Sequence, residues 1–314
     1  MKILLTGVTG FIGTELIQEL SNKNFDLSVI LRHKTDYLPS VIKQFVIGDF
    51  AKHTDYSNAL TDIDCVIHLA GKAHVIDKRK TSVLDEFRLI NADLSLNIAK
   101  QAAAAGVNRF VFLSSIGVNG NQNIKPFLES DAPNPQEPYA ISKYEAEQGL
   151  FKLAKETGME VVIIRPPLVY GTNAPGNFGR LISWASKKHP MPLPLGLVSN
   201  SRSLVAIDNL VDFIITCVTH KNAANKVFLI SDREDLSTTQ LLRKIEKAFG
   251  KKVFLLPVSV KLMIFMAGLL GRNADAIRLF SSLQVDSSKA KELLNWNPKI
   301  TVDEQLLKIA KAQK

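Results

Sequence analysis

The chain has 314 residues, of which 46% are hydrophobic and 22% are charged. This composition indicates a globular protein with one large core and a smaller second one, and excludes a disordered chain, a collagen-like fibre and a disulfide-built scaffold. With 39 lysines and arginines against 30 aspartates and glutamates, the net charge is +9, which favours contact with nucleotides, phospholipid headgroups or nucleic acid without choosing among them.

The cysteines and the first residues of the chain indicate the cellular compartment in which the protein works. Cys65 lies in an apolar run and Cys217 in a helical pattern, so the two have neighbours too different to suggest a disulfide and are too few for a zinc cage. The start, MKILLTG, lacks the longer apolar stretch and cleavage site of a signal peptide. We therefore expect a cytoplasmic protein. No histidine pair has metal-ligand spacing, so no metal is expected.

Short apolar runs recur through the first half of the chain, and helical patterns separate them. The runs cover residues 3–6, 27–31, 45–47, 65–70, 110–113 and 161–164. Continuous β-rich runs of this length are typical of strands that are covered on both faces. Apolar residues at helical spacing fill residues 83–98, and Gly106 is placed to end that helix. The alternation predicts an α/β fold with a Rossmann-type, doubly wound parallel sheet.

After Pro166 and Pro167 this alternation breaks, and glycine and proline crowd residues 171–196. We expect a first domain over residues 1–165 and a smaller α/β substrate lobe over residues 166–314, partly interleaved with the first. Residues 253–270 are mostly apolar but are interrupted by Pro257 and Lys261. The segment is therefore predicted to be a buried or interfacial helix and not a membrane span.

A glycine-rich turn, TGVTGFIG, follows the first apolar run and opens a helix. Glycines three apart let the backbone turn tightly and approach a pyrophosphate, whose charge then meets the free amides of the helix. A plain strand-to-helix turn is the alternative. Its position in the chain favours dinucleotide binding by five residues of the turn: Gly7, Gly10, Phe11, Ile12 and Gly13.

Arg32 stands at the end of the second run, about 20 positions after the glycine turn, where an acidic residue would hold the adenosine ribose of NAD. An arginine there accommodates the 2′-phosphate of NADP, so Arg32 indicates NADP or relaxed cofactor choice; an exposed basic turn is the alternative. Asp49, after the third run, is a candidate acceptor for the adenine amino group or an ordinary helix cap.

A tyrosine and a lysine four positions apart begin a later helix in the stretch PYAISK. This spacing places Tyr139 and Lys143 on one face of the helix. A neighbouring ammonium and the oxidised nicotinamide both favour the phenolate form, so we expect them to lower the pKa of Tyr139, which could then exchange a proton with a sugar hydroxyl. Lys143 could also hold the nicotinamide ribose. Ser115 closes the fifth run, at the sheet edge where ligands bind in this architecture, and is the candidate donor to the same oxygen.

The motifs GVTGFIG, VFLSSIGVNG and YAISK, in this order, resemble the extended short-chain dehydrogenases, the NAD-dependent epimerase/dehydratase family that acts on nucleotide sugars. The resemblance covers nearly the whole chain and implies NAD or NADP as cofactor. It implies that Leu69 and Ala70, in HLAG, lie along the cofactor, and we place Ser114 beside it as well. Asn91 matches a helix asparagine with a structural role near the active site.

The same resemblance implies a substrate site in the C-terminal lobe. Asn177 in GNFGR and Arg202 in NSRSLVAIDNLVD match positions that hold the pyrophosphate of a UDP-sugar in this family. Arg180 and Arg278 are weaker candidates for the same anion. A guanidinium group suits a diphosphate because it donates two parallel hydrogen bonds.

Within the family, the chain is similar to the group that contains UDP-glucose 4-epimerases and 4-keto-sugar reductases. The resemblance disfavours the dehydratase branch, because Ile116 follows Ser115 where dehydratases carry an acidic pair. Typical 4-epimerases carry an aspartate where this chain has Arg32 and retain NAD. We therefore expect oxidoreduction at carbon 4 of a nucleotide sugar, with reduction slightly ahead of epimerisation.

Two other functions stay open. A non-catalytic nucleotide sensor or RNA-binding member fits the charge, but such a protein has no need of both Tyr139 and Lys143, so no nucleic acid is expected. Action on a lipid-linked sugar diphosphate would use residues 253–270 for a weak membrane-surface contact. By analogy with the family, we expect a homodimer formed through the helices that carry Asn91 and Tyr139.

Overall fold

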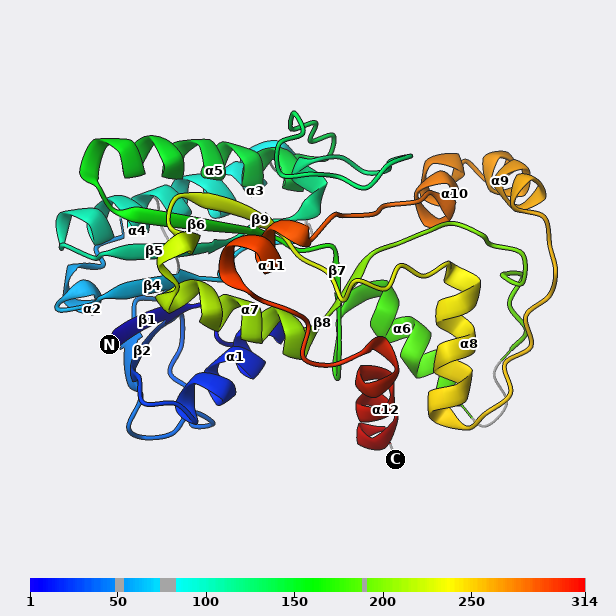
Figure 1. Cartoon of the computed structure of the whole chain (residues 1–314), viewed down its shortest axis with the longest axis horizontal. Helices are drawn as coiled ribbons and strands as arrows, with labels where there is room; N and C mark the ends of the chain where they lie inside the picture. Colours follow the sequence, from blue (N-terminus) through cyan, green and yellow to red (C-terminus); the bar gives the residue numbers. More distant parts are fainter. Residues whose placement is uncertain (49–53, 74–82, 188–190, 314) are drawn as a thin grey trace.

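A seven-stranded, entirely parallel sheet with the order β3-β2-β1-β4-β5-β6-β9 organises the protein (Figure 1). The structure, a computed structural model, describes residues 1–48, 54–73, 83–187 and 191–313. The strands are β1 (Lys2–Thr6), β2 (Asp26–Leu31), β3 (Lys43–Val46), β4 (Cys65–His68), β5 (Arg109–Leu113), β6 (Glu160–Arg165), β7 (Leu168–Tyr170), β8 (Leu204–Ala206) and β9 (Lys226–Leu229). All six apolar runs of the first half form strands, and the predicted fold class is confirmed.

The helices cover the sheet and build the C-terminal part. They are α1 (Phe11–Ser21), α2 (Ser57–Leu60), α3 (Val83–Phe87), α4 (Leu94–Ala104), α5 (Pro138–Thr157), α6 (Gly176–Ala185), α7 (Ile207–Thr219), α8 (Thr238–Phe249), α9 (Val260–Leu269), α10 (Asn273–Phe280), α11 (Ser288–Leu294) and α12 (Val302–Ala312). A π-helix (Arg88–Asp93) joins α3 to α4, and 3₁₀ turns cover Ile116–Val118 and Lys221–Ala223.

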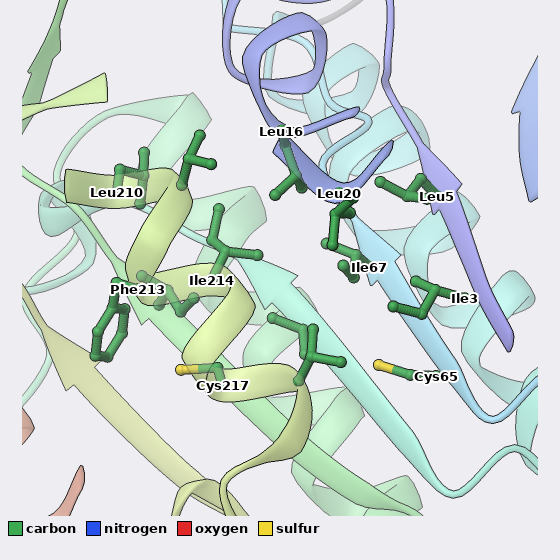
Figure 2. Close-up of a cluster of buried hydrophobic side chains, with 14 of the residues drawn as sticks. Ile3, Leu5, Leu16, Leu20, Cys65, Ile67, Leu210, Phe213, Ile214 and Cys217 are labelled. Atoms are coloured by element: carbon green, nitrogen blue, oxygen red, sulfur yellow. The ribbon is translucent and has the colours of Figure 1, made fainter. Parts of the chain in front are cut away.

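Side chains of the central strands alternate between two buried layers. On β1, Ile3 and Leu5 pack with α1 and α7, whereas Leu4 packs on the opposite face with α4 and α5. Figure 2 shows the first layer, in which Cys65 and Cys217 both lie. Our sequence argument gave these cysteines unrelated surroundings; they share one core, where both are free thiols and burial raises the pKa of Cys65 to about 12.

Residues after position 165 complete the large sheet. Strand β9 pairs with β6 in parallel, and α7 packs against the same face as α1. The two-stranded sheet β7–β8 and helices α6, α8 and α12 form a second apolar cluster. The expected interleaving is therefore visible, while the division into residues 1–165 and 166–314 stays a prediction.

The apolar segment 253–270 forms a helix only from Val260, three residues after Pro257, and α9 has no buried residue. Of the two positions we expected for this segment, buried or interfacial, the first is therefore wrong. Within the described parts of the chain, no helix has both the length and the apolar character needed to cross a membrane.

Candidate active site

The glycine turn packs closely against its neighbours at the carboxyl end of β1. Gly7 has a φ of +76°, and a Cβ there would lie 2.6 Å from the backbone nitrogen of Ala70. A Cβ on Gly13 would lie 2.2 Å from the carbonyl oxygen of Gly7. Gly10 precedes α1 without any side-chain cap, so the first amides of α1 are not capped by a side chain. The geometry suits a pyrophosphate at this helix end, as predicted.

A buried chain of hydrogen bonds connects this turn to the helix that carries Asn91. The Ala70 amide donates to Thr6 Oγ1 (3.3 Å), which contacts His68 Nδ1 (2.9 Å); His68 Nε2 contacts Ser95 Oγ (2.9 Å). Because Ser95 donates its own proton to the Asn91 carbonyl (2.8 Å), His68 must carry its proton on Nε2. Burial lowers the pKa of His68 to about 3, so it is neutral and structural.

Asn91 lies in the π-helix and holds the segment after β4 against α5. Its side chain accepts from the Lys72 amide (2.8 Å) and donates to the Lys72 carbonyl (3.0 Å) and to Ser142 Oγ (3.0 Å). Ser142 in turn donates to the carbonyl of Tyr139 (2.7 Å). The role near the active site that the resemblance implied for Asn91 is thus visible as a brace on the first turn of α5.

Lys143 is buried beneath Gly71, the residue that follows the HLA segment. Its Nζ donates to the Leu113 carbonyl (2.9 Å) and lies 4.5 Å from the centre of the Phe112 ring. A Cβ on Gly71 would lie 3.1 Å from Nζ, so a side chain at this position would require the lysine to shift by a few tenths of an ångström. Burial lowers the pKa of Lys143 to about 8, and the carboxylate of Glu147 partly opposes that shift.

Tyr139 follows Pro138, which starts α5 as predicted, and its ring meets the ring of Phe87 edge to face at 6.0 Å. The lysine alone does not produce the lower pKa that we expect from the lysine and the nicotinamide together, because burial raises the pKa of Tyr139 to about 12. Desolvation of the phenolate therefore exceeds any stabilisation by the lysine one turn away.

Ser115 lies two residues after β5, at the start of a 3₁₀ turn. It caps the 3₁₀ turn, because its Oγ accepts from the Gly117 amide at 3.1 Å, which leaves its hydroxyl proton available for a ligand. A Cβ on Gly117 would lie 3.2 Å from the side chain of Ala140 and 3.5 Å from Ser115 Oγ, so the turn that holds the serine lies against the first turn of α5.

Ser114, predicted to contact the cofactor, turns into the protein instead. Its hydroxyl donates to Glu147, whose carboxylate also pairs with Arg165 through Nε (3.0 Å) and Nη2 (2.5 Å). Arg165 Nη1 donates to Asn119 Oδ1 (2.9 Å). All four side chains are buried, and the hydroxyl of Ser114 is occupied by the Glu147 carboxylate. No pattern in the sequence predicted this network.

Of the two residues predicted to contact the adenosine end of the cofactor, the structure describes Arg32 but not Asp49. Arg32 is exposed directly after β2, and no ion pair holds its side chain within the described residues, so its contact with a ligand phosphate stays a prediction. Asp49 lies outside the described residues. Leu69 and Ala70 follow β4 directly and pack on Gly7, and their contact with the cofactor stays a prediction.

On the substrate side, Asn177 and Arg180 line a cavity of about 1000 Å³ that opens beside α6. Gly171, whose Cβ would contact the Phe11 ring at 3.4 Å, lines the same cavity and places it next to the start of α1. Its lining does not include Ser115, Tyr139 or Lys143 among the described residues, so we locate the chemistry by the strand ends and not by this cavity.

Arg202 and Arg278 come together, although the sequence separates them widely. Arg202 Nη1 donates to the carbonyls of Arg278 (3.0 Å) and Ser281 (3.1 Å), and burial together with the charge of Arg278 lowers the pKa of Arg202. Arg278 pairs with Glu137 at 2.6 Å, two residues before Tyr139. Two neighbouring guanidinium groups at the start of α5 suit a diphosphate.

The π-helix is a further feature that the sequence did not reveal. The apolar spacing predicted one helix over residues 83–98, whereas α3, the π-helix and α4 follow one another without a gap. Such π-helical turns are rare and often occur at functional sites. Here the extra residue turns Asn91 into the protein, where it reaches Lys72 and Ser142.

Comparison with known proteins identifies the family. Residues 3–231 match the NAD dependent epimerase/dehydratase family. The chain belongs to this family. A UDP-glucose 4-epimerase of Vibrio cholerae is 41% identical over 99% of this chain and 95% of its own length. The N-acetyl-alpha-D-glucosaminyl-diphospho-ditrans,octacis-undecaprenol 4-epimerase of Escherichia coli O157:H7 is 28% identical over 80% of this chain and 73% of its own.

The epimerase/dehydratase fold is also found by structural comparison. A UDP-glucuronic acid 4-epimerase of Bacillus cereus, solved in complex with NAD, superposes with a TM-score of 0.80 at 22% identity, covering 100% of this chain and 99% of the other. At this identity the match shows the fold alone. The resemblance stated from GVTGFIG, the serine pair and YAISK is confirmed by the family match.

Proposed function

We propose that this member of the epimerase/dehydratase family is an NAD-dependent 4-epimerase of a UDP-hexose. The observation that carries the proposal is a continuous set of contacts: Gly7 packs on Ala70, and the next residue, Gly71, packs on the Nζ of Lys143. The glycine turn and the tyrosine–lysine helix therefore border one site at the carboxyl ends of β1, β4 and β5.

The residues present fit a dinucleotide. Side chains at Gly7 and Gly13 would collide with backbone, and the uncapped start of α1 offers amides to a pyrophosphate. Bound NAD would supply the chemistry of accepting a hydride from a carbon and giving it back. Lys143, with its ammonium under Gly71, would hold the ribose hydroxyls on the nicotinamide side.

The steps of proton transfer would be shared among three side chains: Tyr139, Lys143 and Ser115. Tyr139 would accept the proton of the sugar hydroxyl at its phenolate oxygen and later return it. Its pKa is raised by burial, so this step needs a nearby positive charge, and Lys143 on the same helix face supplies one. Ser115, whose hydroxyl proton remains available, would donate to the same sugar oxygen and hold it in place.

The substrate's diphosphate would lie between the strand ends and the C-terminal part. Asn177 and Arg180 line the cavity beside α6, and Arg202 lies beside Arg278, which the Glu137 ion pair holds at the start of α5. We assign the diphosphate to this side because it offers an amide and three guanidinium groups around the route to Tyr139.

Our preference for reduction rested on Arg32, and the comparisons support epimerisation better, because the relative at 41% identity is named as a UDP-glucose 4-epimerase. The two reactions use Ser115, Tyr139 and Lys143 identically. They differ in whether the oxidised sugar is re-reduced on its other face, so the direct test is interconversion of two UDP-hexose epimers without added reductant.

The experiment is to incubate the purified protein with UDP-glucose or UDP-N-acetylglucosamine and NAD and to resolve the 4-epimers by chromatography. Tyr139→Phe should lower turnover by about 100-fold or more, the usual contribution of a positioned proton donor, while leaving NAD affinity within a factor of two or so. Lack of epimerisation by the wild type, with NADPH-dependent reduction of a 4-keto sugar nucleotide, would replace the proposal by the reductase.

A second candidate is 4-epimerisation of a sugar diphosphate that is attached to a lipid. The Escherichia coli relative acts, by its name, on an undecaprenol-linked sugar. The specific observation that favours this candidate here is the exposed apolar helix α9, which packs beside α10, the helix that carries Arg278. Comparing a UDP-linked with a polyprenyl-linked sugar diphosphate in the same assay distinguishes the two substrates.

A further inference from the structure

Helix α9 exposes an apolar stripe that no described element covers. The stripe consists of Leu262, Phe265, Met266 and Leu269, whose exposed fractions are 52, 62, 51 and 68%. Their spacing of three, one and three residues places them on one face of the helix. Phe254 and Leu256, just before α9, are also exposed. An exposed apolar surface of this kind marks a binding face.

The stripe is too short to be a membrane span. Helix α9 has 10 residues, which corresponds to about 15 Å, half the thickness of a bilayer's hydrocarbon layer. A short helix of this kind can bury its apolar side chains in the headgroup region while lying parallel to the membrane. Phenylalanine, leucine and methionine are the side chains that such helices insert.

The charges around the stripe indicate which partner it meets. Residues 251–280 contain five basic residues and one acidic residue: Lys251, Lys252, Lys261, Arg272 and Arg278 against Asp275. A symmetric contact between two copies would bring the same basic residues face to face, which costs free energy. An anionic lipid surface instead attracts basic residues, by about 1 kcal/mol for each one near the surface.

Contacts through α10 also connect the stripe to the candidate active site. Helices α9 and α10 lie side by side at the end of the molecule away from β1 and β2 (Figure 1). Arg278 of α10 pairs with Glu137, and the carbonyl of Arg278 accepts from Arg202. Contact of α9 with a surface would therefore hold that surface next to the substrate side of the protein.

We propose that the α9 stripe docks on the surface of an anionic lipid bilayer, with the helix lying in the headgroup layer and Lys252 and Lys261 against the lipid phosphates. This goes beyond the proposed catalytic function and does not depend on it, because docking is a property of residues outside the catalytic machinery.

The test is sedimentation of the full chain with vesicles of phosphatidylcholine alone and of phosphatidylcholine mixed with phosphatidylglycerol. We expect binding to the mixed vesicles that falls as salt is added. The double variant F265E/M266E should reduce the partition coefficient by about tenfold or more, the factor that corresponds to losing one buried phenyl ring. The urea-unfolding midpoint of the variant should stay close to that of the wild type, which shows that the variant is folded.

Val41→Glu is the matched control, because Val41 is 85% exposed between β2 and β3, and β2 and α9 lie at opposite ends of the molecule (Figure 1). It should bind vesicles like the wild type. Lys252→Glu together with Lys261→Glu should weaken binding to the mixed vesicles. Absence of vesicle binding, or binding that F265E/M266E leaves unchanged, would overturn the proposal. Concentration-dependent dimers that this variant abolishes, without vesicle binding, would identify a second copy as the partner instead.

Discussion

Removal of the carboxylate of Glu147 tests whether the Glu147–Arg165 pair stabilises the protein as its burial suggests. The two side chains are 2% and 4% exposed, and the carboxylate accepts from Arg165 and from Ser114. In Glu147→Gln the shape is kept, but the Arg165 guanidinium stays charged and buried without its counter-ion. The protein has to place an uncompensated charge in its interior.

The expected loss follows from burial. Breaking one partner of a buried ion pair costs about 3–5 kcal/mol. Glu145→Gln is the matched control, because Glu145 pairs with Arg88 with similar geometry (Nε to both oxygens at 3.0 Å, Nη2 at 2.7 Å) but with side chains 33% and 43% exposed. An exposed pair of this kind contributes about 0–1 kcal/mol. The two variants therefore differ by about 2–5 kcal/mol in free energy of unfolding, the difference between those two ranges.

Urea unfolding followed by circular dichroism measures both variants under the same conditions, with the slope m as the check that the unfolding reaction is unchanged. Adding Arg165→Met to Glu147→Gln removes the unpaired charge and should recover part of the lost stability. Equal losses for Glu147→Gln and Glu145→Gln, or no recovery in the double variant, would refute the reasoning that burial makes this pair important.

Three further predictions address the cofactor site and its support. Gly13→Ala should lower NAD affinity by at least about tenfold, since its Cβ would lie 2.2 Å from the Gly7 carbonyl oxygen and must push α1 away. Gly10→Ala, whose Cβ would lie 3.3 Å from the same atom, should lower NAD affinity less. Calorimetric titration with NAD compares the two variants. Arg32→Ala should weaken binding of NADPH far more than of NADH in the same titration, and equal effects would remove Arg32 from cofactor choice. The pKa of His68 is lowered to about 3 from an ordinary value of 6.5, so His68 binds a proton more readily in the unfolded chain. The free energy of unfolding should therefore fall by about 1.4 kcal/mol per pH unit below pH 6.5. In His68→Asn, urea unfolding between pH 6.5 and 4 should show a smaller dependence of this free energy on pH.

Local patterns in the sequence were sufficient for the strands and the glycine turn. A buried parallel strand is a continuous apolar run, and Gly7 is required by its own φ and by the backbone it approaches. The start of α5 at Pro138 was also predictable, because proline favours the first turn of a helix. Each of these features depends on residues that are close in the chain.

The features that were missed depend on contacts between distant residues. Ser114 could not be assigned to Glu147 from spacing, since they are 33 positions apart and meet only once α5 packs on β5. The lysine near Tyr139 is visible in the sequence, whereas the burial that raises the pKa of Tyr139 is not. The pairing of Arg202 with the carbonyl of Arg278 also joins residues 76 positions apart.

The position of β9 has a consequence for engineering hybrid enzymes. Strand β9 and helix α7 follow residue 165 in the chain, yet they complete the large sheet and its core layer. Exchanging everything after β6 between two relatives, in order to transfer sugar preference, would also exchange one edge of the dinucleotide-binding half. A workable chimaera would instead need one further crossover on each side of that returning segment, so that the host keeps its own α7 and β9.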